Sequence, residues 1–156
     1  PDAFTESYGF LSAADETTVE LVDVNVKATL LILKRLLPRV LAARVPRIIL
    51  TGSTSALPGN GRPEVAFGAS KAALNGIAAA LREGYRERGL GVTLLQLGYL
   101  NTEDPLAVPL ERALQRGGTE LVPVHDVVTL VRAIVSLSPS AFVKEVTLPA
   151  IGDIRF

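Results

Sequence analysis

The sequence predicts an α/β fold in which helices cover both faces of a doubly wound parallel sheet. Helical and strand-like segments alternate along the chain, which is typical of strands joined by helical crossovers. The strand-like segments are nearly continuous apolar runs, as in parallel strands that are buried on both faces. Only three such strands occur, and the first long helix has no strand before it. The 156 residues are therefore predicted to form one partial domain, the second half of such a sheet.

The first half of the chain contains one long helix and one short strand. Residues 1–14 are predicted to be a loop, and residues 15–44 repeat apolar side chains near helical spacing. Pro38 should bend this helix or limit its last turns. The segment "RIILTGSTS" (47–55) begins as a buried strand and ends in small polar residues. The proline and glycine content of "ALPGNGRP" (56–63) then predicts a loop.

The second half continues the alternation. A helix is predicted over residues 64–88 and is closed by Gly89. Residues 91–100, "GVTLLQLGYL", are predicted to be another buried strand. The polar and mixed segment 103–120 is predicted to be a flexible flap. The chain then ends with the helical pattern "VHDVVTLVRAIVSL" and the strand pattern "KEVTLP".

Composition excludes several classes of function. The chain is 48% hydrophobic with a mean hydropathy of +0.34, which fits either a sheet covered on both faces or a large surface buried against a partner. Sixteen basic and sixteen acidic residues cancel, so nothing indicates binding to nucleic acid or to an anionic membrane. With no cysteine and only His125, neither disulfides nor a protein metal site are expected. Charged residues interrupt the apolar stretch 28–45, and the N-terminus is acidic, so we expect a cytoplasmic protein.

The helix at 64–88 carries a lysine on its apolar face. That face is formed by Phe67, Lys71, Leu74, Ala78, Leu81 and Tyr85. An ammonium group there costs desolvation unless it reaches a partner or water, although a lysine that snorkels at the edge of the face is an equal alternative. A tyrosine four residues earlier would lie beside the ammonium, but Phe67 holds that position and cannot donate or accept a proton.

Polar residues in two other places are candidates for a site. The hydroxyls of "TGSTS" follow the first strand, and ligands of open parallel sheets bind at the carboxyl ends of strands. The alternative is a turn in which these hydroxyls bond to the backbone. Asn25 interrupts the apolar run "LVDVNVKATLLIL", where a helix interior disfavours it, so it has either a functional or a structural hydrogen bond.

Together these segments resemble the short-chain dehydrogenase/reductase family. The resemblance is carried by "VDVNVKATLLILKRLLP", "RIILTGSTSA" and "FGASKAALNGIAAALREGYRERGLGVTLLQLGYLNTE", in this order, over residues 20–103. The last helix and strand fit the family less specifically. The resemblance implies a Rossmann-type fold and hydride transfer between NAD or NADP and a small-molecule carbonyl or alcohol.

The resemblance also implies catalytic roles for matching residues. Asn25 matches the asparagine that holds a water of a proton relay. Ser53, with Ser55 as the alternative, matches the serine that polarises the substrate. Lys71 matches the lysine that binds the nicotinamide ribose and lowers the pKa of the catalytic tyrosine. The position of that tyrosine is held by Phe67.

Cofactor residues are implied in the same way. The stretch "LGYLNT" resembles the family's nicotinamide-side loop, with Leu97 in place of its proline and Gly98 retained. The Leu100 backbone and Thr102 would be the cofactor contacts. The glycine-rich fingerprint that cradles the pyrophosphate is absent from these 156 residues, so the main cofactor-binding segment is expected to lie outside them.

The departure from the family at Phe67 keeps a second interpretation open. Loss of a general acid at Phe67 typically costs a factor of about 10² to 10⁴ in rate. We therefore weigh an oxidoreductase impaired at this position against a catalytically inactive dinucleotide-sensing or scaffold protein. In either case the resemblance implies a homodimer or homotetramer that pairs through the helices at 15–44 and 64–88.

Overall fold

The computed structural model describes residues 10–60 and 63–153 and confirms the parallel α/β fold. Its main sheet has the order β1-β2-β5, formed by β1 (Arg47–Thr51), β2 (Gly91–Leu97) and β5 (Glu145–Leu148). Both pairings are parallel, with Ile49 opposite Thr93 and Gln96 opposite Thr147. Every residue of β2 is buried, as expected of a central strand that is covered on both faces.

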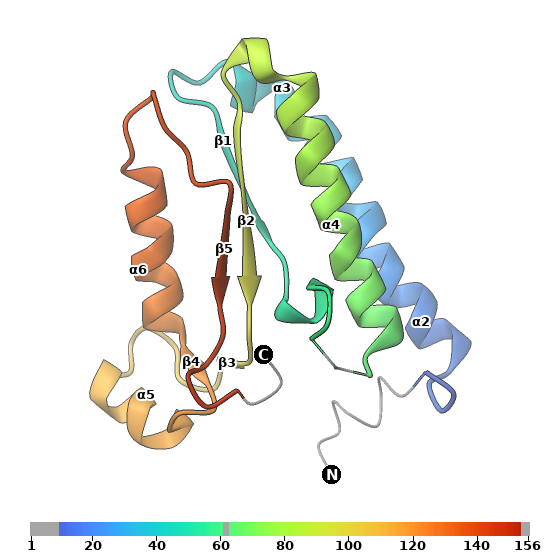
Figure 1. Cartoon of the computed structure of the whole chain (residues 1–156), viewed down its shortest axis with the longest axis vertical. Coiled ribbons are helices and arrows are strands. Elements are labelled where there is room, and N and C mark those ends of the chain that lie inside the picture. Colours follow the sequence, from blue (N-terminus) through green and yellow to red (C-terminus); the bar gives the residue numbers. More distant parts are fainter. Residues whose placement is uncertain (1–9, 61–62, 154–156) are drawn as a thin grey trace.

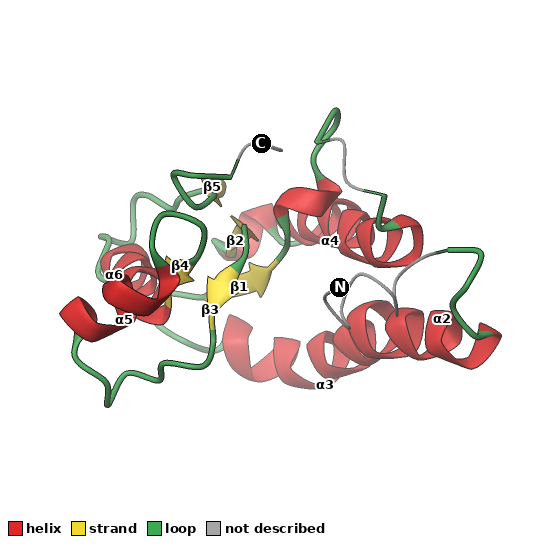
Figure 2. Cartoon of the chain, turned by 90° about the horizontal axis from the view of Figure 1, so that it is seen from below, coloured by secondary structure: helices red, strands yellow, loops and turns green. Residues whose placement is uncertain are grey.

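Helices cover the two faces of this sheet (Figures 1 and 2). Helix α4 (Val65–Gly84) packs on one face together with the first helical segment, and α6 (Val124–Val135) lies on the other. Two apolar clusters result. The first is centred on Leu74, Ala78 and Leu94, and the second on Leu95, Leu97 and Ile134. Adjacent residues of β2 thus point to opposite cores, which fixes the register of the sheet.

The first helix differs from the single α-helix predicted at 15–44. It consists of α2 (Asp15–Val22), a π-helical stretch (Asp23–Ala28) and α3 (Thr29–Leu41). The hydroxyl of Thr29 donates a hydrogen bond of 2.8 Å to the Asn25 carbonyl at the end of the widened stretch. As expected, the helix ends soon after Pro38, because proline removes one backbone donor from the last turns.

The helix predicted at 64–88 also ends earlier than expected. α4 stops at Gly84 and is followed by a 3₁₀ turn, Arg86–Arg88. Gly89 closes this segment with a φ of 68°, a left-handed conformation that favours glycine. The predicted position of the glycine is therefore confirmed, whereas the last four residues before it are not α-helical.

The strand predicted at 91–100 is divided at Gly98. β2 ends at Leu97, and the short β3 (Leu100–Asn101) pairs in parallel with β4 (Val122–Pro123). Between them, the segment predicted as a flap contains α5 (Leu110–Gly117), which its mixed composition did not indicate. At the same edge of the fold lie the carboxyl ends of the main strands and the N-terminal end of α4 (Figure 1). None of the helices in the described part of the chain is long and apolar enough to cross a membrane.

Candidate active site

A cavity of about 750 Å³ opens at the carboxyl ends of β1 and β2. Residues from four parts of the chain line it. These are Thr51, Gly52, Ser53 and Ser55 after β1; Glu64, Phe67 and Lys71 from the start of α4; and residues 97–103 with Leu121. The structure therefore brings together every candidate residue of the sequence analysis except Asn25, which does not line the cavity. This is the edge where open parallel sheets bind ligands.

Lys71 enters the cavity from α4. Its ammonium donates a hydrogen bond of 3.2 Å to the Thr51 carbonyl at the end of β1 and lies 5.7 Å from the centre of the Phe67 ring. The side chain is half-buried, and desolvation by burial lowers the pKa of Lys71 below its ordinary value of 10.5. A cation whose hydration is partly lost is well suited to bind a polar ligand group in the cavity.

A buried glutamine fixes the turn that carries Ser53. Gln96, 0% exposed in the middle of the sheet, accepts a hydrogen bond of 3.1 Å from the Ser53 backbone N–H. Its amide nitrogen donates to Asn75 (3.0 Å) and to Glu145 (3.3 Å). A Cβ at Gly52 would overlap Gln96 Oε1 and lie 3.1 Å from the Leu95 carbonyl oxygen, so a larger residue would displace the Gln96 amide from its hydrogen bonds. Sequence reasoning missed this residue, although a glutamine within "TLLQL" is a visible anomaly.

The hydroxyl groups of the two candidate serines have different partners. Ser53 is buried, and its Oγ accepts a hydrogen bond of 3.1 Å from the Ser55 backbone N–H, which caps the short 3₁₀ turn Thr54–Ala56. The Oγ of Ser55 instead donates to the Glu64 carboxylate at 2.6 Å. Both serines line the cavity.

Gly98 also lines the cavity. Its N–H donates a hydrogen bond of 3.0 Å to the Leu148 carbonyl, which brings the two backbones together after β2 and β5. A Cβ at this position would lie 3.0 Å from the Cα of Pro149. Glycine is therefore required for this close approach, and it fixes the path of the chain toward Leu100 and Thr102.

Asn25 contacts α4 from the π-helical stretch and does not line the cavity. Its amide nitrogen donates a hydrogen bond of 3.0 Å to the Ser70 hydroxyl, which in turn donates to the Phe67 carbonyl at 2.8 Å. These bonds join the π-helical stretch to the turn of α4 that carries Phe67 and Lys71. The sequence analysis identified the asparagine but not Ser70, its partner, which is 2% exposed.

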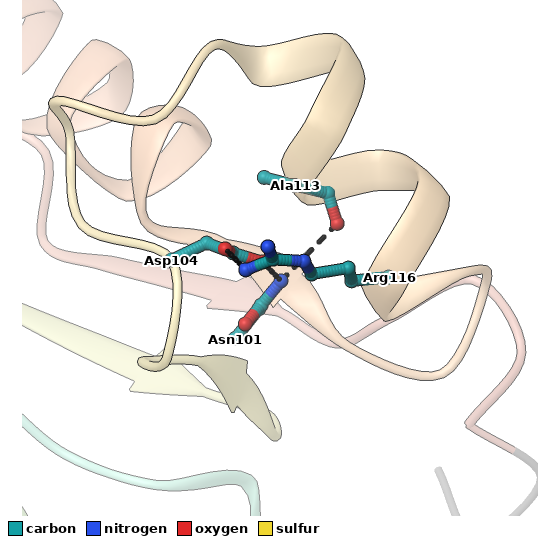
Figure 3. Close-up of polar contacts among 4 residues, drawn as sticks. All are labelled: Asn101, Asp104, Ala113 and Arg116. Carbon is teal, nitrogen blue, oxygen red and sulfur yellow. Dashed lines mark hydrogen bonds and ion pairs between the residues drawn. The ribbon is translucent and has the colours of Figure 1, made fainter.

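A polar cluster joins α5 to the end of β3 and the loop that follows it (Figure 3). The Asn101 amide nitrogen donates to the Asp104 carboxylate (2.9 Å) and to the Ala113 carbonyl (3.1 Å). Arg116 of α5 forms an ion pair with the other oxygen of Asp104. Asp104 is 1% exposed and Asn101 4%, so this pair is shielded from solvent at the start of the segment predicted as a flap.

We expect Asp104→Ala to lower the free energy of unfolding by about 2 kcal/mol, because Asn101 loses a buried acceptor and Arg116 its counter-charge. In hydrogen exchange, the amides of α5 should exchange faster while those of β2 stay protected. Glu111→Ala, at an exposed position of the same helix, is the control. Unchanged exchange in α5 would show that these contacts do not hold the helix.

Comparison with known proteins assigns the family. A family model described as short chain dehydrogenase matches residues 4–107. The chain belongs to the short-chain dehydrogenase family. Among its relatives is the oxidoreductase UcpA of Escherichia coli (strain K12), 31% identical over 107 residues that make up 66% of this chain and 38% of the relative. The 3-oxoacyl-[acyl-carrier-protein] reductase MabA of Mycobacterium avium is 28% identical over 115 residues, 74% of this chain and 44% of the relative. The chain thus spans less than half the length of these curated relatives.

Solved structures share the fold. Serine dehydrogenase from Escherichia coli superposes with a TM-score of 0.70 at 21% identity, covering 88% of this chain and 55% of that one. An alcohol dehydrogenase from the archaeon Thermococcus sibiricus, complexed with 5-hydroxy-NADP, superposes with a TM-score of 0.75 at 15% identity. The match covers 91% of this chain and 57% of that one. These similarities confirm the Rossmann-type fold. Within the described residues, no group of three or more His, Cys, Asp or Glu side chains could hold a metal ion.

Proposed function

We propose that the intact protein is an NAD(P)-dependent oxidoreductase that transfers a hydride between nicotinamide and a small carbonyl or alcohol substrate. The observation that carries this proposal is the cavity at the strand ends. It combines the half-buried ammonium of Lys71 with the hydroxyls of Ser53 and Ser55, opposite the Gly98 loop. Family membership and the bound cofactors of similar structures, NADH in one and an NADP derivative in another, support it.

The donor groups of the cavity fit the nicotinamide half of a dinucleotide. The Lys71 ammonium suits the ribose hydroxyls, because it can donate to both oxygens of a vicinal diol. Gly98 keeps the opposite wall free of a side chain. The backbone of Leu100 and the exposed hydroxyl of Thr102 are proposed to bind the carboxamide. When bound there, the nicotinamide supplies the hydride donor or acceptor.

Among the remaining candidate residues, one is proposed to act directly on the substrate oxygen. The Ser53 hydroxyl would donate a hydrogen bond to a carbonyl oxygen and so polarise it, because the Ser55 hydroxyl already donates to Glu64. We retain for Asn25 the role of holding a water of the proton relay. Phe67 contributes only an apolar surface under the Lys71 ammonium.

Calorimetric titration of the intact protein with NADH and with NADPH tests the cofactor assignment. We expect saturable binding of one of them, weakened by Lys71→Met. Lys34→Met, an exposed lysine of α3 outside this cavity, is the control and should bind the cofactor like the unaltered protein. Absence of heat and of any change in nicotinamide fluorescence with both cofactors would contradict the proposal.

Phe67 favours a second candidate function, a dinucleotide-sensing or scaffold protein that has kept the fold without catalysis. Such a protein would bind the cofactor but would not turn over. Sustained oxidation or reduction by the unaltered protein therefore contradicts this alternative, whereas cofactor binding alone fits both functions.

An apolar groove between α3 and α4 supports the proposed homo-oligomer. The groove encloses about 860 Å³ and is lined mainly by Leu30, Leu33, Leu37, Ile77, Ala80 and Leu81. Leu30 is 48% exposed, and the neighbouring Leu31 and Ile32 are 46% and 55% exposed. Apolar patches of this kind mark association surfaces in proteins. We propose that the same helices of a second copy cover it, giving a dimer or tetramer.

Light scattering of the intact protein at micromolar concentration is expected to show a dimer or tetramer. Leu30→Glu should weaken self-association at least about tenfold, because a carboxylate would have to be buried in the apolar interface. Leu106→Glu, which is 51% exposed and lies outside the groove, should leave the mass unchanged. A monomeric unaltered protein would contradict this assignment.

A further inference from the structure

The proposed reaction needs a group that exchanges a proton with the substrate oxygen, and the Phe67 ring cannot do so. The cavity nevertheless contains a phenol from another element. Tyr99 lies in the turn between β2 and β3 and lines the same cavity as Phe67, Lys71 and Ser53. A phenol from the turn after β2 is thus available in the cavity as a proton donor.

The phenol of Tyr99 is paired with a carboxylate. Its hydroxyl donates a hydrogen bond of 3.3 Å to Glu64 Oε1, and the Ser55 hydroxyl donates one of 2.6 Å to Glu64 Oε2. Both oxygens of Glu64 therefore accept hydrogen bonds, one of them from a second cavity residue. Ser55 fixes the orientation of the carboxylate toward Tyr99.

Glu64 lies immediately before the first turn of α4. It is the N-cap residue, yet its side chain makes no capping hydrogen bond to the helix. Its carboxylate instead turns to Ser55 and Tyr99, while the positive end of the helix dipole favours its charge. Spacings of three and seven residues place Glu64 on the face of α4 that carries Phe67 and Lys71. Glu64 thus lies about one helical turn before Phe67, the position at which the family has its tyrosine.

We propose that Tyr99 and Glu64 form the proton-transfer pair of this site. The inference rests on the proposed oxidoreductase function. In alcohol oxidation, the carbinol C–H bond breaks and its electron pair leaves as hydride to the oxidant, a nicotinamide dinucleotide. The substrate O–H proton passes to Tyr99 Oη as the Tyr99 proton moves to Glu64 Oε1, and the C–O bond becomes a carbonyl. Carbonyl reduction reverses each transfer.

The pair is tested by kinetics of the intact protein with NAD⁺ or NADP⁺ and the secondary alcohols cyclohexanol and 1-phenylethanol. Tyr99→Phe and Glu64→Gln should each lower kcat about 10²-fold and leave KM nearly unchanged. The double variant should be no slower than either single variant, because the two residues act as one unit. Glu111→Gln, which neutralises an exposed carboxylate of α5 outside the cavity, should retain the full rate.

Phe67→Tyr provides the second measurement, since it places a phenol at the family's position. It should restore the rate lost in Tyr99→Phe and in Glu64→Gln, which also shows that these variants are folded. Full activity of Tyr99→Phe or Glu64→Gln overturns the inference. That result leaves the oxidoreductase function standing. Activity of Phe67→Tyr alone, with none in the unaltered protein, overturns both the inference and the proposed function and favours the non-catalytic alternative. If neither turns over, the proposed function itself fails.

Discussion

Replacing Lys71 with methionine is expected to lower kcat/KM of the intact protein about 10³-fold. Among the described residues that line the cavity, Lys71 alone carries a positive charge. Its ammonium donates a hydrogen bond to the Thr51 carbonyl at the end of β1 and lies near the Phe67 ring. Methionine keeps most of the apolar stem but removes the charge and its hydrogen bonds. Removing one preorganised donor from a site usually costs a factor of about 10² to 10³, and loss of cofactor affinity adds to it. Initial rates at several cofactor concentrations would separate the two contributions.

The same substitution should slightly stabilise the fold. Burial lowers the pKa of Lys71 below 10.5, so carrying its charge costs free energy in the folded state. That cost is complete at pH values below the lowered pKa. It disappears as the pH rises toward 10.5, because the folded state then binds fewer protons than the unfolded state. Lys71→Met should therefore gain about 0.5 kcal/mol near neutral pH and lose this advantage in alkaline solution.

Chemical denaturation of both proteins at neutral and alkaline pH measures this difference. Solvent screening of the half-exposed ammonium keeps the gain small. A variant that is less stable than the unaltered protein at neutral pH would show that the contacts with Thr51 and Phe67 outweigh desolvation. Unchanged kcat/KM in Lys71→Met would show that Lys71 has no role in cofactor binding or catalysis.

Gln96→Leu is expected to cost about 3 kcal/mol of unfolding free energy. The substitution leaves the Ser53 backbone N–H and the Asn75 side-chain oxygen Oδ1 without their buried partners. Each such group costs about 1 to 3 kcal/mol of unfolding free energy. Leu95→Met, an equally buried change on the same strand, should cost only about 1 kcal/mol. Activity should fall further than stability explains, because the Ser53 turn loses its support.

Denaturant titration of the two variants provides the comparison. A loss below that of Leu95→Met would show that water or a neighbouring residue replaces the Gln96 amide. Gly52→Ala acts on the same contact from the other side, since its Cβ would overlap the Gln96 side chain. It should destabilise the protein as Gln96→Leu does.

The fold was largely predictable because it depends on local pattern. The apolar run of β2 and the spacing of Leu74 and Ala78 on α4 indicate their burial without knowledge of their partners, and both are found in the core. The π-helical stretch was not predictable, because helical spacing over 15–44 does not reveal one widened turn. Helix α5 was not predictable from its mixed composition. Its contacts with the rest of the fold include the hydrogen bonds of Asn101 with Asp104 and with the Ala113 carbonyl.

The site was predictable in outline only. Lys71 stood out because a charge on an apolar face needs a partner, and the structure supplies the Thr51 carbonyl. Glu64 and Tyr99 did not stand out, since a glutamate before a helix and a tyrosine after a strand are both ordinary. Their contact joins residues 35 positions apart, and such pairs become visible only when the strand ends and α4 meet at one edge.

The intact protein is proposed to catalyse nicotinamide-dependent hydride transfer. The most direct test of this claim is the initial rate of cofactor reduction or oxidation by the unaltered protein, with cyclohexanol and 1-phenylethanol in one direction and ethyl acetoacetate in the other. We predict turnover at about 1 s⁻¹ or faster with at least one of these substrates. A protein that binds NADH or NADPH but shows no turnover in either direction would contradict the claim and identify a binding protein instead.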